Sequence, residues 1–239
     1  MSIPKIINRL IGKAMHNYQM LDDGDRVMVA VSGGLDSLVL SAVLKEWQKK
    51  APIRYQLIGV HLDMGFPEGS VASATERQLQ KLGVDFVIEK TTFGPDALAE
   101  KSGKSGCFYC ARNRRTRLFN LAREKECNKL ALGHHKEDII ETFFLNLFYS
   151  GNLSTMVPRQ PLFNGNLNVI RPLAYLNKEQ VKSLAHLFGI TAAENPCPLA
   201  GRSKREKIRT ILQELYGKDA QLESNIFAAL SNVRKDYLL

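Results

Sequence analysis

The sequence lacks long apolar runs and has few cysteines, and each shortage excludes a class of protein. No stretch of about 18 apolar residues occurs, so we expect no transmembrane helix. The N-terminal segment does not resemble a signal peptide, because polar residues such as Lys5, Arg9 and Lys13 interrupt its apolar positions. Four cysteines in such a chain are not expected to form disulfides. We therefore expect a cytoplasmic protein with no membrane partner.

Composition and charge describe a globular, basic chain. Apolar residues make up 44% and charged residues 24% of the sequence, the ordinary range for a globular domain. The 239 residues suffice for one large α/β domain, with or without a small extension. The net charge of +9 favours a polyanionic partner, most commonly nucleic acid, although a basic protein need not bind one.

A glycine-rich loop lies near the start of the chain, between a predicted strand and a predicted helix. Residues 27–31 form an apolar run, which indicates a strand buried on both faces of a parallel sheet, and residues 38–49 predict a helix. Between them lies Ser32-Gly33-Gly34-Leu35-Asp36-Ser37. The glycines let backbone N–H groups face an anion at the positive end of the helix dipole, and the two serines add hydroxyl donors.

The same loop differs from the Walker phosphate-binding motif, because no Lys-Ser or Lys-Thr ends it. It resembles the PP-loop of the adenylating ATP pyrophosphatase superfamily, whose members split ATP between the α- and β-phosphates. Asp36 is itself an anion, so it requires either a bridging Mg²⁺ or a role in capping the helix. An ordinary strand–turn–helix is the alternative interpretation of the loop.

Strands and helices alternate along the chain, which predicts a doubly wound parallel α/β sheet with helical extensions at both ends. Further strands are predicted at 55–62, 85–89, 129–132 and 169–170, and further helices at 3–18, 71–82, 137–147, 178–188, 203–216 and 220–234. Residues 148–168 are rich in Ser, Gly, Asn and Pro and predict a long loop.

Ligands of such sheets bind beyond the carboxyl ends of the strands. The second strand ends with His61, Asp63 and Met64, and the fourth is followed by Gly133, His134 and His135. We expect a nucleotide on the glycine loop to place its base near residues 62–64. A carboxylate at a strand end can equally cap a turn, so Asp63 has a purely structural alternative.

Three of the four cysteines form a candidate ligand set. Cys107 and Cys110 are spaced as C-x-x-C in a loop that opens a basic helix, and Cys197 lies far away between two prolines. Cys127, just before the fourth strand, fits an ordinary buried thiol. A redox pair, a zinc site with a fourth ligand, an iron–sulfur cluster with one open iron and three unrelated thiols all remain alternatives.

The helix after the cysteine pair is strongly basic. It contains Arg112, Arg114, Arg115 and Arg117, and no acidic residue lies among them. The arginines therefore cannot all pair within the segment, and contacts to phosphate groups are one use for them. A solvent-facing basic helix is the alternative.

Taken in order, these motifs resemble the tRNA 2-thiocytidine synthetase family, a PP-loop branch of the tRNA thiolases. The resemblance covers roughly residues 25–212 and extends from the glycine loop through Cys-Phe-Tyr-Cys, Leu-Gly-His-His-Lys-Glu-Asp and Arg-Pro-Leu to Pro-Cys. It implies the adenine nucleotide alpha hydrolase-like fold. It also implies an enzyme that adenylates a pyrimidine carbonyl oxygen in the tRNA anticodon loop and replaces that oxygen with sulfur.

The resemblance further implies cofactors, partners and residue roles. ATP and Mg²⁺ would be bound by the loop residues, and a 4Fe-4S cluster would be held by three cysteines. The sulfur would come from sulfide or a cysteine desulfurase, and a homodimer is considered as the assembly. Cluster ligands would be Cys107, Cys110 and Cys197; ATP-binding residues Ser32, Gly33, Gly34, Asp36, Ser37, His61, Asp63, Met64, Gly133 and His134; catalytic residues Asp36, Arg114 and Asp138.

The chain departs from this family in two respects. Leu35 stands where a lysine is common in the loop, which removes one phosphate-neutralising charge, and the chain is short. Two alternative functions therefore remain: a PP-loop ligase that adds an amine to an adenylated base or small molecule, and a non-catalytic protein that binds nucleotide or RNA. We divide the chain into an N-terminal helix (1–20), a PP-loop domain (21–175) and a helical extension that contributes Cys197 (176–239).

Overall fold

The computed structural model describes residues 2–66, 70–99, 106–201 and 203–237. The chain forms two compact units. The first contains Met1–His135 and Pro158–Ala200, and the second contains Lys136–Val157 and Gly201–Leu239. Cys197 belongs to the first of these units. The three ranges that the sequence suggested stay a prediction.

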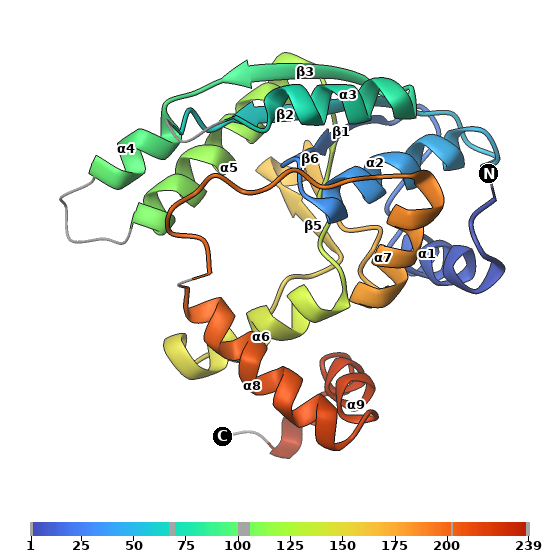
Figure 1. The fold of residues 1–239 in the computed structure, drawn as a ribbon. Helices are drawn as coiled ribbons and strands as arrows, with labels where there is room; N and C mark the ends of the chain where they lie inside the picture. The colour runs from blue at the N-terminus through green and yellow to red at the C-terminus, as the bar shows by residue number, and fades with distance from the viewer. Residues whose placement is uncertain (1, 67–69, 100–105, 202, 238–239) are drawn as a thin grey trace. The chain divides into compact units, whose positions relative to one another are not determined.

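A six-stranded sheet forms the centre of the first unit (Figure 1). Its strands are β1 (Arg26–Ala30), β2 (Gln56–Asp63), β3 (Asp85–Lys90), β4 (Lys129–Ala131), β5 (Arg159–Leu162) and β6 (Leu167–Ile170). Their order is β3-β2-β1-β4-β6-β5, and all pairs are parallel except β5 with β6. The predicted doubly wound parallel sheet is confirmed, with one antiparallel edge strand added.

Helices cover both faces of this sheet. Four of them pack on one face: α1 (Lys5–Asn17), α2 (Leu35–Gln48), α3 (Ala72–Leu82) and α7 (Lys178–Phe188). The opposite face packs against α5 (Gly106–Glu124), which follows the short α4 (Phe93–Ala99). Successive residues of β1 point to opposite faces, so Val27 and Val29 join the first core and Met28 joins the second. This explains why β1 is apolar throughout.

The second unit is helical. It consists of α6 (Lys136–Ser150), α8 (Lys204–Lys218), α9 (Leu222–Ala229) and the 3-10 turn η2 (Lys235–Tyr237). Ile140, Ile208 and Leu212 form its small core. Beside them the buried Glu141 accepts hydrogen bonds from Arg209 Nε at 2.7 Å and Nη2 at 3.1 Å. Across the described residues, no helix combines the length and apolarity that a membrane crossing requires.

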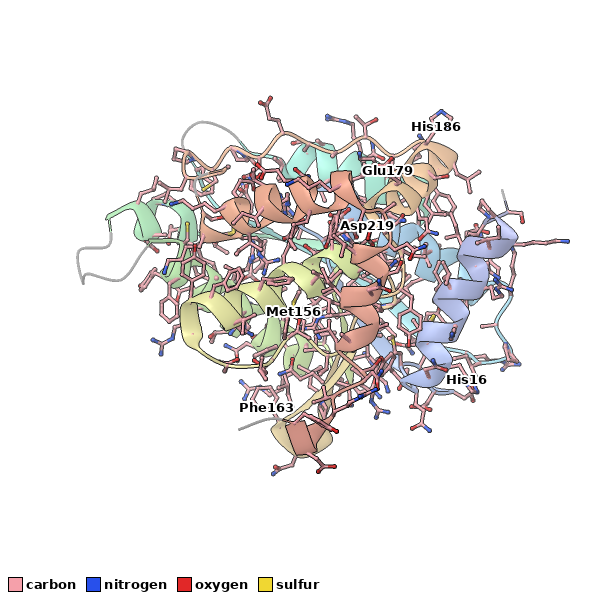
Figure 2. The ribbon with its side chains drawn as sticks, turned by 90° about the horizontal axis from the view of Figure 1, so that it is seen from below. His16, Met156, Phe163, Glu179, His186 and Asp219 are labelled. Atoms are coloured by element: carbon pink, nitrogen blue, oxygen red, sulfur yellow. The ribbon has the colours of Figure 1, made fainter. Side chains whose placement is uncertain are left out.

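Two sequence expectations about local structure were wrong, and one helix was not predicted at all. The segment predicted as a loop over 148–168 contains β5 and the 3-10 turn η1 (Phe163–Gly165), whose Phe163 (labelled in Figure 2) packs edge-on against Phe119. The helix α4 was not predicted, because Gly94 and Pro95 are poor helix formers. The last long helix ends at Ala229 rather than at residue 234.

Candidate active site

The glycine loop joins β1 to α2 in a tight turn that its own hydroxyl groups hold in place. Gly33 has a φ of 85°, and a Cβ there would lie 2.7 Å from Thr75 Oγ1, so only glycine fits without strain. Ser37 Oγ accepts a hydrogen bond from Ser32 N–H at 3.1 Å and donates one to Gly34 O at 2.9 Å. The helix α2 begins directly after Gly34, and its positive end therefore faces the loop.

The segment that follows β4 packs closely on the start of α2. A Cβ on Gly133 would lie 2.8 Å from the carbonyl carbon and oxygen of Asp36, so this glycine is required by contact with the backbone. His135 Nε2 lies 3.9 Å from Asp36 Oδ2. The structure thus brings the predicted residues of the glycine loop and Gly133 together at one edge of the sheet, where a nucleotide site was expected.

Asp36 forms an ion pair that the sequence did not predict. Lys178 Nζ, at the start of α7, donates to Asp36 Oδ1 at 2.6 Å. The two residues are 142 positions apart, and lysines are common on helix surfaces. No local sequence signal could therefore have identified this pair.

His134 is oriented by the arginine of the Arg-Pro-Leu motif. Arg171 Nε donates to His134 Nδ1 at 3.3 Å, and burial lowers the pKa of Arg171 to about 10. Because Nδ1 accepts this hydrogen bond, a neutral His134 carries its proton on Nε2. The imidazole is thereby held as a donor at the carboxyl end of the sheet.

The three candidates on β2 and directly after it differ in their surroundings. His61 lies within the strand, is 1% exposed and contacts Val31 O through Nδ1 at 2.8 Å, while its Nε2 finds no hydrogen-bond partner among the described residues. Asp63 accepts from Gly65 N–H at 3.1 Å and Ser70 Oγ at 2.8 Å, which is the turn-capping arrangement considered above. Met64 packs partly buried against the second core.

The three candidate cysteines line one cavity of ≈ 170 Å³. Arg114 and the apolar side chains of Leu98 and Leu199 line it as well. Burial is the main cause that raises the pKa of Cys110; Arg114 opposes it, and Cys107 and Cys197 reinforce it. The thiols are therefore close enough to interact electrostatically, and their role as ligands stays a prediction.

The segment after α7 carries Cys197 to this cavity. It runs from α7 past α2 and reaches the start of α5 (Figure 1). On the way, Ala193 N–H donates to Gly33 O at 3.2 Å, which ties the segment to the glycine loop. At its end, Leu199 lies 3.8 Å from where a Cβ on Gly106 would stand. The helix α5 begins at Gly106, so Cys107 and Cys110 lie within the helix rather than in the loop expected before it.

Three thiols that line one cavity have the donor chemistry of an iron–sulfur site. In the described part of the chain, no group of three or more His, Cys, Asp or Glu side chains is arranged to hold one metal ion. Each cysteine of a cluster binds a different iron, so the sulfurs surround a space instead of converging on a point. Cys127 lies apart in the second core, and burial raises its pKa.

The basic helix is only partly available for phosphate contacts. Arg117 forms ion pairs with Glu89 of β3 and with Glu124 at the end of its own helix. Its Nη1 lies 2.6 Å from Glu124 Oε1. This arginine therefore has a structural role, while Arg112, Arg114 and Arg115 are exposed. Asp138 belongs to the second unit, where Arg205 Nη1 lies 3.6 Å from its carboxylate.

Comparison with known proteins first defines the class. Residues 4–215 match the family model described as the PP-loop domain, which agrees with the doubly wound sheet and the Ser-Gly-Gly loop after its first strand. In structure the chain is similar to the U34-tRNA thiolase NcsA of Methanococcus maripaludis, solved with its [4Fe-4S] cluster. The TM-score is 0.76 at 22% identity, over 95% of this chain and 78% of that one.

Relatives in sequence define the family more narrowly. The tRNA-cytidine(32) 2-sulfurtransferase of Alkalilimnicola ehrlichii is 40% identical over 99% of this chain and 76% of its own length. The enzyme of the same name from Syntrophotalea carbinolica is 40% identical over 98% of this chain and 91% of its own length. The chain belongs to the tRNA-cytidine(32) 2-sulfurtransferase family of PP-loop proteins, which confirms the resemblance found in its motifs.

Proposed function

We propose that the protein is an ATP-dependent tRNA sulfurtransferase that replaces the 2-carbonyl oxygen of a cytidine in the anticodon loop with sulfur. Membership of the family supports the reaction class and the substrate. The observation that carries the proposal is the meeting of Cys107, Cys110 and Cys197 around one cavity, in the same unit as the glycine loop.

In the first half-reaction, the carbonyl oxygen of the base attacks the α-phosphorus of ATP, and pyrophosphate leaves. The backbone N–H groups of the loop, the hydroxyls of Ser32 and Ser37 and the dipole of α2 stabilise the triphosphate. The carboxylate of Asp36 is the group that would hold Mg²⁺ there, and that ion supplies charge neutralisation to the leaving pyrophosphate. His134, fixed by Arg171, adds an N–H donor.

In the second half-reaction, sulfide replaces the adenylated oxygen and AMP leaves. Cys107, Cys110 and Cys197 would hold a 4Fe-4S cluster, and that group would supply the site with a positioned sulfur nucleophile. Arg114 lines the same cavity and offers a cation to the departing AMP phosphate. Asp138 is proposed as the carboxylate that acts near the base.

The sulfur donor, the assembly and the compartment belong to the same proposal. Sulfide or a cysteine desulfurase supplies the sulfur, the active form is a homodimer, and the enzyme works on tRNA in the cytoplasm. The net charge of +9 agrees with a polyanionic substrate.

Nucleoside analysis by mass spectrometry of tRNA from a deletion strain tests the proposal. We expect 2-thiocytidine to be absent and to return with the wild-type gene or with Cys127→Ala, but not with Cys107→Ser. An unchanged nucleoside profile would contradict the proposal. Loss of an amine-modified base instead of a thiolated one would favour the amine ligase.

A further inference from the structure

Lys178 lies at the glycine loop although it comes from a distant helix. It is the first residue of α7, and its ammonium group is 2.6 Å from Asp36 Oδ1. The Lys178 side chain is 38% exposed and that of Asp36 is 31% exposed. Both groups are therefore accessible to a ligand that binds at the loop.

The position of Lys178 does not serve the helix to which it belongs. A cation in the first turn faces the positive end of the helix dipole, which is the unfavourable end. The N-terminus of α7 is already satisfied by a capping box, in which Asn177 and Gln180 exchange hydrogen bonds of 2.9 and 3.0 Å. A partly exposed ion pair also contributes little to stability. These facts point to a use for Lys178 outside the helix.

The loop itself lacks the charge that a triphosphate requires. Residues 32–37 contain no lysine or arginine, and Asp36 adds a negative charge at the place where phosphates are expected. His135 also approaches Asp36, with Nε2 at 3.9 Å from Oδ2. Lys178 brings a flexible ammonium group with three donors to this carboxylate.

We propose that Lys178 is an ATP-binding residue that contacts the β- and γ-phosphates. Without nucleotide, its ammonium group rests on Asp36. When ATP binds with Mg²⁺ at the Asp36 carboxylate, the ammonium group donates to the phosphate oxygens and supplies the positive charge that residues 32–37 lack. This inference rests on the proposed function only in taking ATP as the ligand.

Calorimetry tests the role of Lys178 by measuring the affinity for the non-cleavable analogue α,β-methylene-ATP in the presence of Mg²⁺, so that binding is measured without turnover. Lys178→Met keeps the length of the side chain and removes its charge, and we expect it to weaken analogue binding roughly 10- to 100-fold. Lys178→Arg should retain most of the affinity. Lys182→Met is the matched control, because Lys182 is an exposed lysine on the same helix that pairs with Glu179 (labelled in Figure 2).

A comparison of ligands separates a phosphate contact from a merely structural effect. Lys178→Met should weaken the binding of inorganic pyrophosphate as much as the binding of the analogue, and it should leave the binding of AMP unchanged. Equal affinity for the analogue in Lys178→Met and the wild type would overturn the inference, and so would an equal loss for AMP and pyrophosphate. A wild type that binds no analogue would overturn the ATP-dependent function as well.

Discussion

The buried His61 links the stability of the sheet beside the glycine loop to pH. His61 contacts the carbonyl oxygen of Val31, the residue immediately before Ser32, and burial is the main cause that lowers its pKa from the ordinary value of 6.5. Below pH 6.5 the unfolded chain binds a proton that the folded chain excludes. The free energy of unfolding should therefore fall as the pH decreases through this range.

The variant His61→Gln tests this coupling. Urea unfolding of the wild type at pH 7.5 and pH 5.5 should show a loss of stability at the lower pH, to which the lowered pKa of His61 contributes. The variant has no imidazole at this position, so it should lose less stability than the wild type between the two pH values. An identical decrease in both proteins would contradict the role of His61.

Residues of the site differ in how well the sequence reveals them. Ser32 to Ser37 form a local motif, and the spacing of Cys107 and Cys110 is a local signal as well. From the sequence, Asp63 indicates only where its strand ends. The hydrogen bonds that it accepts from Gly65 and Ser70 in the structure show that it caps a turn. Lys178 gives no signal at all, because it reaches Asp36 only through the packing of α7 beside α2.

Among the elements, the junction of the β4 end with the start of α2 is the most restrictive. Gly133 lies against the backbone of Asp36 and Ser37, and a Cβ would stand 2.8 to 2.9 Å from their atoms. Backbone cannot rotate away as a side chain can, so any larger residue must push the two elements apart. The geometry of the loop therefore depends on a glycine that follows the neighbouring strand β4.

The variant Gly133→Ala should destabilise the protein by about 1–3 kcal/mol, the usual cost of overpacking. It should also weaken binding of α,β-methylene-ATP, because the start of α2 moves. Chemical denaturation and calorimetry measure the two effects. Gly217→Ala is the control, since a Cβ there meets nothing within 4 Å. If Gly133→Ala matched this control in both measurements, the close contact would not matter.

The sequence predicted the bounds of a helix correctly where residues typical of helix ends flank it. The helix α7 was expected at 178–188, and the cap at Asn177 and the left-handed Gly189 explain why its bounds agree with the structure. Strand β5 escaped detection because it is short, contains Pro161 and lies at the edge of the sheet. Its antiparallel pairing with β6 depends on tertiary contacts that composition does not encode.

At the scale of the whole molecule, the candidate site is completed by a chain segment that returns to the first unit. Residues 158–200 belong to this unit although α6 precedes them in the chain and belongs to the second unit. They contain Arg171, Lys178 and Cys197. Each of these residues contacts or adjoins a group from the first 135 positions: His134, Asp36 and the cavity of Cys107 and Cys110, respectively. These pairs of residues are far apart in the sequence, and they meet only when the chain folds into the first unit.

The iron content of the anaerobically reconstituted protein tests the account most directly. Iron and acid-labile sulfide are measured for the wild type, for Cys197→Ser and for Cys127→Ala, whose thiol lies away from the cavity. We predict about four irons per chain in the wild type and in Cys127→Ala, and a large loss in Cys197→Ser. A Cys197→Ser protein with as much iron as the wild type, or a colourless wild type that holds zinc, would contradict the account.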